Sequence, residues 1–236
     1  MHTSDRTPPP ITGASDVTSA VRIQILATEH WSLLATRSLI WNEIFSRATM
    51  FLTVLSGAVV ALSFVGQATD FGEEFHLVSL FLLPVILAVG LGTFFRVCDA
   101  NDDDVGLVIG MNRLRRAYLE IAPDLEPYFV TGSHDDQRGI MLTYAADAKL
   151  HPIRWLSATS VLVGVVDSVV AGVLAGMVCQ ASGWSDVIGL AVGIVVALTT
   201  AGLLARIPLR AIARYREEHQ PRFPTPGDVI ARERGA

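Results

Sequence analysis

Four long runs of apolar residues constrain this chain more than any other feature of its sequence. They cover residues 48–66, 77–96, 157–180 and 186–205, and each is about long enough to cross ~30 Å of hydrocarbon as a helix. Of the 236 residues, 51% are hydrophobic and only 17% are charged, which is more apolar than an ordinary soluble domain. The sequence therefore predicts an all-α integral membrane protein with four transmembrane helices and cytoplasmic helical extensions.

Every basic residue lies on one side of these runs. The short connections at residues 67–76 and 181–185 contain neither Lys nor Arg, whereas the other segments hold all 18 basic residues. Basic loops remain in the cytoplasm, so we expect a multi-pass plasma membrane protein whose N- and C-termini are cytoplasmic. The formal net charge of −5 argues against a nucleic-acid partner. The excess of Arg over Lys, seventeen to one, favours a bacterial source.

The runs divide the chain into six segments. They are a disordered tail over residues 1–15, an amphipathic cytoplasmic helix over 16–47, a first transmembrane hairpin over 48–96, a cytoplasmic helical hairpin over 97–156, a second transmembrane hairpin over 157–205, and a basic cytoplasmic helix with a disordered tail over 206–236. We expect the helix over 16–47 to continue into the first run, with Glu43 and Arg47 paired at i, i+4. Trp31 and Trp41 on this helix mark either the headgroup level or a contact with the other cytoplasmic helices.

The predicted cytoplasmic hairpin carries an apolar stripe. Its members repeat with the spacing 4, 3, 4, 3 on a helix that ends before Pro123, and they are Leu107, Met111, Leu114, Tyr118 and Ile121. Such a stripe on a water-exposed helix needs a partner. The candidates are the second helix of the hairpin, which would begin after Ser133 as its N-cap, and a cytosolic protein.

Asp167 is the most informative single residue, because it lies near the middle of the third run. A carboxylate at the bilayer centre costs roughly 2.5 to 3.5 kcal/mol, so it should face the interior of the helix bundle. It is either an ion or proton site or a neutral acid that clamps two helices by a hydrogen bond. The polar residues at similar depth, which are candidate members of this intramembrane site, are Ser168, Ser56, Thr199 and Thr200.

Small residues recur at every fourth position of the third and fourth runs, which predicts that these helices pack closely. The packing positions are Ser160, Gly164, Gly172, Gly176, Gly189 and Gly193. Pro84 lies inside the second run and should kink it, either as a hinge for gating or simply to set the packing.

An acidic cluster follows the second run and consists of Asp99, Asp102, Asp103 and Asp104. It either complements the N-terminus of the next helix or forms a vestibule that attracts cations. Catalytic motifs and histidine pairs with metal-ligand spacing are absent from the sequence, so we expect neither an enzyme nor a cofactor or metal site.

Three functions remain. The first is a homo-oligomeric channel in which the third run, with Asp167, surrounds the pore and the cytoplasmic helices gate it. The second is a membrane scaffold or regulatory subunit that docks a cytosolic partner through the apolar stripe. The third is a proton-coupled transporter that uses Asp167, although four spans give little room for alternating access unless chains combine.

Overall fold

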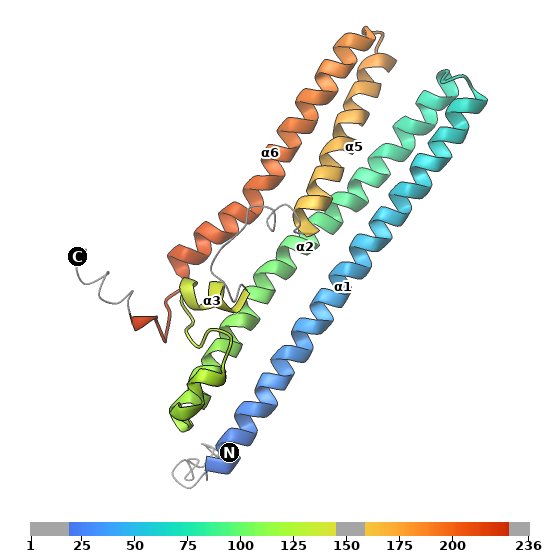
Figure 1. Cartoon of the computed structure of the whole chain (residues 1–236). Coiled ribbons are helices and arrows are strands. Elements are labelled where there is room, and N and C mark those ends of the chain that lie inside the picture. Colours follow the sequence, from blue (N-terminus) through green and yellow to red (C-terminus); the bar gives the residue numbers. More distant parts are fainter. Residues whose placement is uncertain (1–18, 145–158, 227–236) are drawn as a thin grey trace, which may run out of the picture.

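A computed structural model describes residues 19–144 and 159–226 of the chain, which are helical without strands in these ranges. The helices are α1 (Ser19–Ala68), α2 (Glu73–Ile121), the short 3-10 helix η1 (Pro123–Tyr128), α3 (Gln137–Tyr144), α5 (Thr159–Ala181) and α6 (Asp186–Glu218) (Figure 1). Helices α1, α2, α5 and α6 are each long and apolar enough to cross a membrane, which confirms the four predicted runs. The predicted tail over 1–15, the end of the predicted hairpin after residue 144 and the last ten residues lie outside the described residues.

The first two helices are much longer than the apolar runs that they contain. Helix α1 has 50 residues and α2 has 49, so each is about 75 Å long at ~1.5 Å per residue. As predicted, the amphipathic helix before the first run is continuous with it. Helix α2 also continues from its run through the acidic cluster, because no Gly or Pro interrupts residues 93–105. The cluster therefore lies in the middle of a helix, and the prediction that it complements a helix N-terminus is wrong.

The four long helices form an open row (Figure 1). Helix α1 packs on α2, α2 packs on α5 and α5 packs on α6, so α1 and α6 are the two edges of the row. Buried side chains from all four helices fill the contacts between the apolar segments, and they include Phe51, Ile86, Phe94, Val163 and Leu204. Both cysteines, Cys98 and Cys179, are free.

The parts of α1, α2 and α6 that continue beyond the apolar runs form, together with η1 and α3, a polar extension at one end of the molecule. Val108 and Met111 of α2 pack there on Ile140 of α3, so α3 is a second helix against α2 as the predicted hairpin requires. The predicted N-cap Ser133 is wrong. Helix α3 begins at Gln137, and the carboxylate of Asp136 caps it by accepting the N–H of Gly139 (2.8 Å).

The segment that follows α6 is another correction to the sequence analysis. The chain after Pro221 is predicted from its composition to be disordered. In the structure this segment returns to the start of α3, where backbone N–H groups of the tail donate hydrogen bonds to Asp135 and Asp136. Composition alone does not reveal such a contact, because the carboxylates that accept these hydrogen bonds lie about 90 residues earlier in the chain.

Candidate functional site

Asp167 lies in the middle of the apolar segment of α5 and has no exposed surface. Its carboxylate occupies a notch in α2 that exists because residue 90 is a glycine. A Cβ atom at Gly90 would collide with the Oδ1 atom of Asp167 and would lie 2.9 Å from the ring of Phe51 on α1. The site is therefore built by three helices, α1, α2 and α5. It lies inside the packed chain rather than on a surface that a pore could share.

Neither carboxylate oxygen of Asp167 has a hydrogen-bond partner among residues 19–144 and 159–226. The candidate partners Ser56 and Thr199 point away, on exposed faces, and donate to the carbonyl oxygens of Leu52 (2.8 Å) and Val195 (2.7 Å). Hydroxyl groups in helices readily bond in this way to the carbonyl four residues earlier, which explains why the predicted clamp does not form. Thr200 is half-buried and is not a donor to Asp167 either. Both oxygens of Asp167 are thus buried without a hydrogen-bond partner in the described part of the chain.

Ser168 is buried beside Asp167, but its hydroxyl group donates to the carbonyl oxygen of Gly164 (2.6 Å). Gly164 allows Phe94 of α2 to approach α5, since a Cβ there would lie 3.0 Å from the Phe94 ring. Ser160, one turn earlier, is also buried. The beginning of α5 therefore packs on α2 through the small residues that the sequence singled out.

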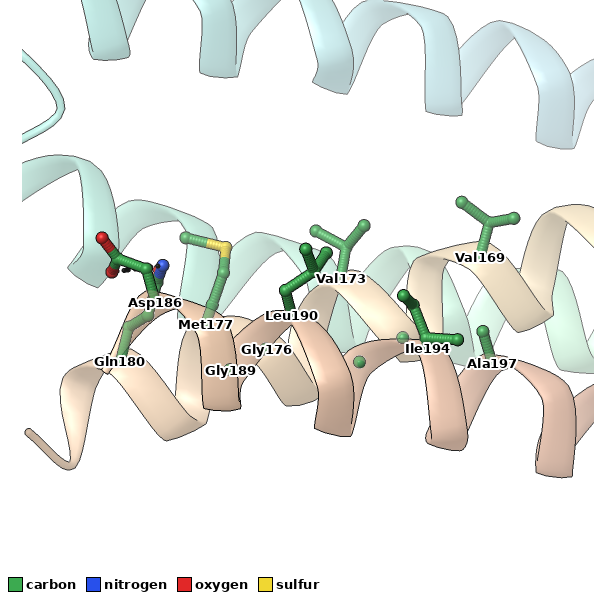
Figure 2. A pocket seen from close by; sticks show the side chains of 12 residues that line it. Val169, Val173, Gly176, Met177, Gln180, Asp186, Gly189, Leu190, Ile194 and Ala197 are labelled. Carbon is green, nitrogen blue, oxygen red and sulfur yellow. Dashed lines mark hydrogen bonds between the residues drawn. The ribbon is translucent and has the colours of Figure 1, made fainter. Parts of the chain in front are cut away.

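The glycines further along α5 lie at its contact with α6. A Cβ on Gly172 would lie 2.6 Å from the carbonyl oxygen of Gly193, and Gly176 and Gly189 face each other in the same way. A groove of about 350 Å³ runs above these glycines between the two helices. Figure 2 shows its apolar walls, to which Val169 and Val173 of α5 and Leu190 and Ile194 of α6 contribute. At the loop end, Gln180 donates a hydrogen bond to Asp186 (3.2 Å).

Helix α1 carries a polar stripe that the sequence analysis missed. Its members are all exposed, and they are Thr49, Thr53, Ser56, Ser63 and Gln67. The spacing of 4, 3, 7 and 4 residues places them on one face of the helix, which is separate from the buried face that contains Phe51 and Ala58. The exposed Val60 lies on the same face in the gap of seven residues. The heptad spacing of hydroxyl residues in an apolar run was the available signal. The sequence analysis placed Ser56 in the Asp167 site instead.

The acidic cluster does not act as one site, because successive helical residues point in different directions. Asp104 is 1% exposed and accepts hydrogen bonds from Arg37 (Nε, 2.6 Å), Trp41 (3.0 Å) and Tyr144 (2.6 Å). Trp41 thus contacts another helix, as one of its two predicted roles required. The hydrogen bond from Arg37 raises the pKa of its guanidinium, and burial followed by the bond to Asp104 raises the pKa of Tyr144. Asp104 joins α1, α2 and α3.

The remaining acids of the cluster have different surroundings. Asp103 lies 3.8 Å from Arg96, whereas Asp99 and Asp102, like Asp104, border a cavity of about 760 Å³ among α1, α2, α3, α5 and α6. Burial raises the pKa of Asp102, and Arg214 of α6, which also lines the cavity, opposes this shift. Three of the four acids therefore line one cavity, Asp104 among them with Arg37 as its ion-pair partner, and the cation vestibule stays a prediction.

The apolar stripe that was predicted to dock a partner is largely covered by the chain itself. Met111 is buried against α3, and the ring of Tyr118 stacks on His30 of α1 with 5.9 Å between ring centroids. Leu114 lies beside residues 24–29 of α1, Leu107 is half-buried and Ile121 at the end of α2 is exposed. The polar extension of α1 thus supplies most of the partner that the stripe requires.

Pro84 lies inside the unbroken helix α2, and its role as a hinge stays a prediction. A second proline, Pro208, lies inside α6 close to the point where the apolar segment ends. Each proline lacks the N–H group that would bond to the carbonyl one turn earlier.

Comparisons with protein families, with curated protein sequences and with solved structures return no match for this chain.

Proposed function

We propose that this protein is a subunit of a homo-oligomeric channel in the plasma membrane, with both termini in the cytoplasm and with the polar stripe of α1 facing the pore. The observation that carries the proposal is the exposed line of hydroxyl and amide side chains along an otherwise apolar edge helix. The proposed pore lining differs from the one expected from the sequence, because Asp167 is buried behind α1.

The two edges of the row differ in a way that supports this arrangement. The exposed side chains of α6 are mainly apolar, as expected for contact with lipid, and include Val187, Leu190, Leu198 and Leu203. Helix α1 instead has three faces. Phe51 and Ala58 pack on the chain itself, the stripe is polar, and a third face with Met50, Val54 and Phe64 is apolar and exposed. The first face suits contact with the chain's own α2, the second suits a water-filled pore, and the third suits lipid or a neighbouring subunit.

The hydroxyl groups of the stripe suit a narrow aqueous pore. Thr53, Ser56 and Ser63 each donate to the carbonyl oxygen one turn earlier, at 2.8 Å, so their oxygens keep lone pairs that can accept from water. A single open row does not enclose a pore. Several copies must therefore assemble with their α1 helices around a common axis.

Cysteine substitution tests the direction in which α1 faces. In a chain with Cys98→Ser and Cys179→Ser, single variants Thr53→Cys and Ser56→Cys are compared with Val54→Cys, which is also exposed in the single chain. A membrane-impermeant cationic thiol reagent should modify the stripe variants at least about tenfold faster, because only thiols in contact with water form reactive thiolates. Ion flux through liposomes should fall as these variants react. Equal reaction rates at Val54 and Ser56 would contradict a pore along the stripe.

A second candidate, proton-coupled transport, is favoured by one observation, the buried carboxylate of Asp167 without a partner among the described residues. The two candidates predict different responses to Asp167→Asn. A transporter loses flux driven by a pH gradient, whereas a channel lined by α1 keeps its flux. The flux assay on this variant therefore decides between them.

A further inference from the structure

The polar extension contains two adjacent acidic residues, Asp135 and Asp136, whose carboxylates accept hydrogen bonds from backbone N–H groups as well as from side chains. Asp135 has no exposed surface. Its Oδ1 atom accepts the N–H of Phe223 (2.7 Å), and its Oδ2 atom accepts the N–H of Arg222 (2.9 Å) and the Nε–H of Arg113 (2.7 Å). One buried carboxylate thus holds two consecutive backbone donors of the C-terminal segment.

Asp136 continues the same recognition. Its Oδ2 atom accepts the N–H of Thr225 (2.6 Å), and its Oδ1 atom accepts the Thr225 hydroxyl group (3.0 Å). Pro224 has no N–H group, so every backbone donor of residues 222–225 is bound by one of the two acids. The backbone of Asp135 completes the contact, since its N–H donates to the carbonyl oxygen of Phe223 (3.3 Å).

Neighbouring groups of α2 and α3 hold the segment that contains Asp135 and Asp136 in place. Asn112 of α2 donates to the carbonyl oxygen of His134 (2.8 Å) and accepts from the hydroxyl group of Thr143 (2.8 Å). Gly139 lets the loop approach α3, because a Cβ there would collide with the His134 carbonyl group. The two acids are therefore positioned by contacts that do not involve the C-terminal segment.

The surroundings of α6 in the polar extension indicate what the bound C-terminal segment holds in place. Helix α5, which lies between α6 and α2 in the row, begins at Thr159, and its first residues Ser160 and Val161 border the same cavity as Pro208 of α6. Tyr215 packs on the cluster of Val108, Met111 and Ile140, and the bound segment follows directly after it. Pro208, with its missing backbone hydrogen bond, lies between this attached end and the apolar segment of α6.

We propose that Asp135 and Asp136 form a recognition site for an extended peptide, and that residues 222–225 occupy it as a latch that holds the end of α6 on α2 and α3. The site binds two consecutive backbone N–H groups that are followed in the peptide by a proline and a threonine. Without the latch, the contacts that attach α6 beyond Pro208 within the described residues include the packing of Tyr215 and the hydrogen bond from the His219 ring to the carbonyl oxygen of Asp135 (2.8 Å). The inference does not depend on the channel.

Hydrogen exchange of the full-length protein in nanodiscs tests the latch directly, because the donors are the exchanging amides. We expect the amides of residues 222–225 to be protected, and Thr225→Pro, which deletes one donor, to accelerate exchange of Arg222 and Phe223 at least about tenfold. Gln220→Pro is the matched control, because the proline falls in the same segment and the N–H of Gln220 makes no contact with the two acids. Unprotected amides in the natural protein, or equal effects of the two prolines, would overturn the latch.

Binding of a separate peptide tests whether Asp135 and Asp136 form a recognition site. The full-length double variant Phe223→Pro and Thr225→Pro should bind a fluorescent peptide with the sequence of residues 219–226, whereas the natural chain should bind it at least about tenfold more weakly because its own tail competes. Adding Asp135→Asn and Asp136→Asn to the double variant should abolish binding. Equal binding by all these proteins, or binding by none, would overturn the recognition site.

Discussion

The side chain of Asp104 accepts hydrogen bonds from Arg37, Trp41 and Tyr144 at the point where α1, α2 and α3 meet. Its neighbour Asp103 is 59% exposed and has only a distant ion pair with Arg96. The two residues are chemically identical and adjacent, but a helix turns by about 100° per residue, so one faces the packed interior and the other faces water. Asp104 is therefore a structural residue.

Replacing Asp104 by alanine should strongly destabilise the polar extension. The change leaves the guanidinium of Arg37 and the indole N–H of Trp41 without their acceptor, and removing one member of a buried ion pair costs about 3 kcal/mol. Asp103→Ala is the matched control and should change the free energy of unfolding by less than about 0.5 kcal/mol. Thermal unfolding of both variants in nanodiscs measures the difference. Similar midpoints for the two would show that the contacts of Asp104 contribute little.

At the level of the helices, α1 and α2 are joined by charged residues just beyond their apolar segments. Arg96 of α2 donates to Glu43 of α1 through Nη2 (3.0 Å), and Arg47 donates to the same carboxylate (2.8 Å), as its i, i+4 spacing predicted. Hydrogen bonds from Arg96 and then Arg47 lower the pKa of Glu43 to about 2. The hydrogen bond to Glu43 raises the pKa of Arg96, and the negative charges of Asp103 and Asp99 add to this shift. The i, i+4 pattern could not reveal Arg96, which lies on another helix.

This pairing predicts a specific pH dependence. Because the pKa of Glu43 is lowered from 4.5, its charge stabilises the fold fully at pH values above 4.5, and the contribution disappears as the pH falls towards about 2. The difference in unfolding midpoint between the natural protein and Glu43→Gln should therefore be constant near neutrality and shrink in acid. Glu120→Gln, which removes a pair within α2 alone, serves as the control. A difference that does not change with pH would show that the interhelical pairing is absent.

For the whole molecule, the open row leaves two edges with different chemistry. The edge formed by α1 is partly polar, and the edge formed by α6 is mainly apolar. A closed bundle of four helices would have no such edges, and its polar residues would face one another. The row instead suits assembly through α1, with α6 towards lipid.

Mass measurement in lipid nanodiscs tests this assembly. We expect a closed ring of several chains, and Gly57→Trp should dissociate it, because Gly57 is exposed on α1 with no atom within 4 Å of an added Cβ in the single chain. Gly202→Trp, at an equally open position on α6, should leave the ring intact. A monomeric natural protein would contradict the proposed channel. Dissociation by Gly202→Trp alone would place the subunit contact at the other edge.

Local regularities in the sequence were enough to predict several features of the fold. Hydropathy over about 20 residues identified four helices long and apolar enough to cross a membrane, and helical periodicity predicted that α1 is continuous and that the apolar stripe needs a partner. Small residues at every fourth position marked Gly172, Gly176 and Gly189, which lie at the contact of α5 with α6. These inferences hold because helix formation and burial depend mainly on nearby residues.

The contacts between residues far apart in the sequence could not be predicted in this way. Asp167 lies against Gly90 rather than a hydroxyl group, and the C-terminal segment is bound by Asp135 and Asp136. Each of these contacts joins residues more than 70 positions apart, and composition says nothing about such pairs. The physical reason is that a buried polar group is stabilised by whichever partner the packing brings within about 3 Å, and that partner depends on the arrangement of whole helices.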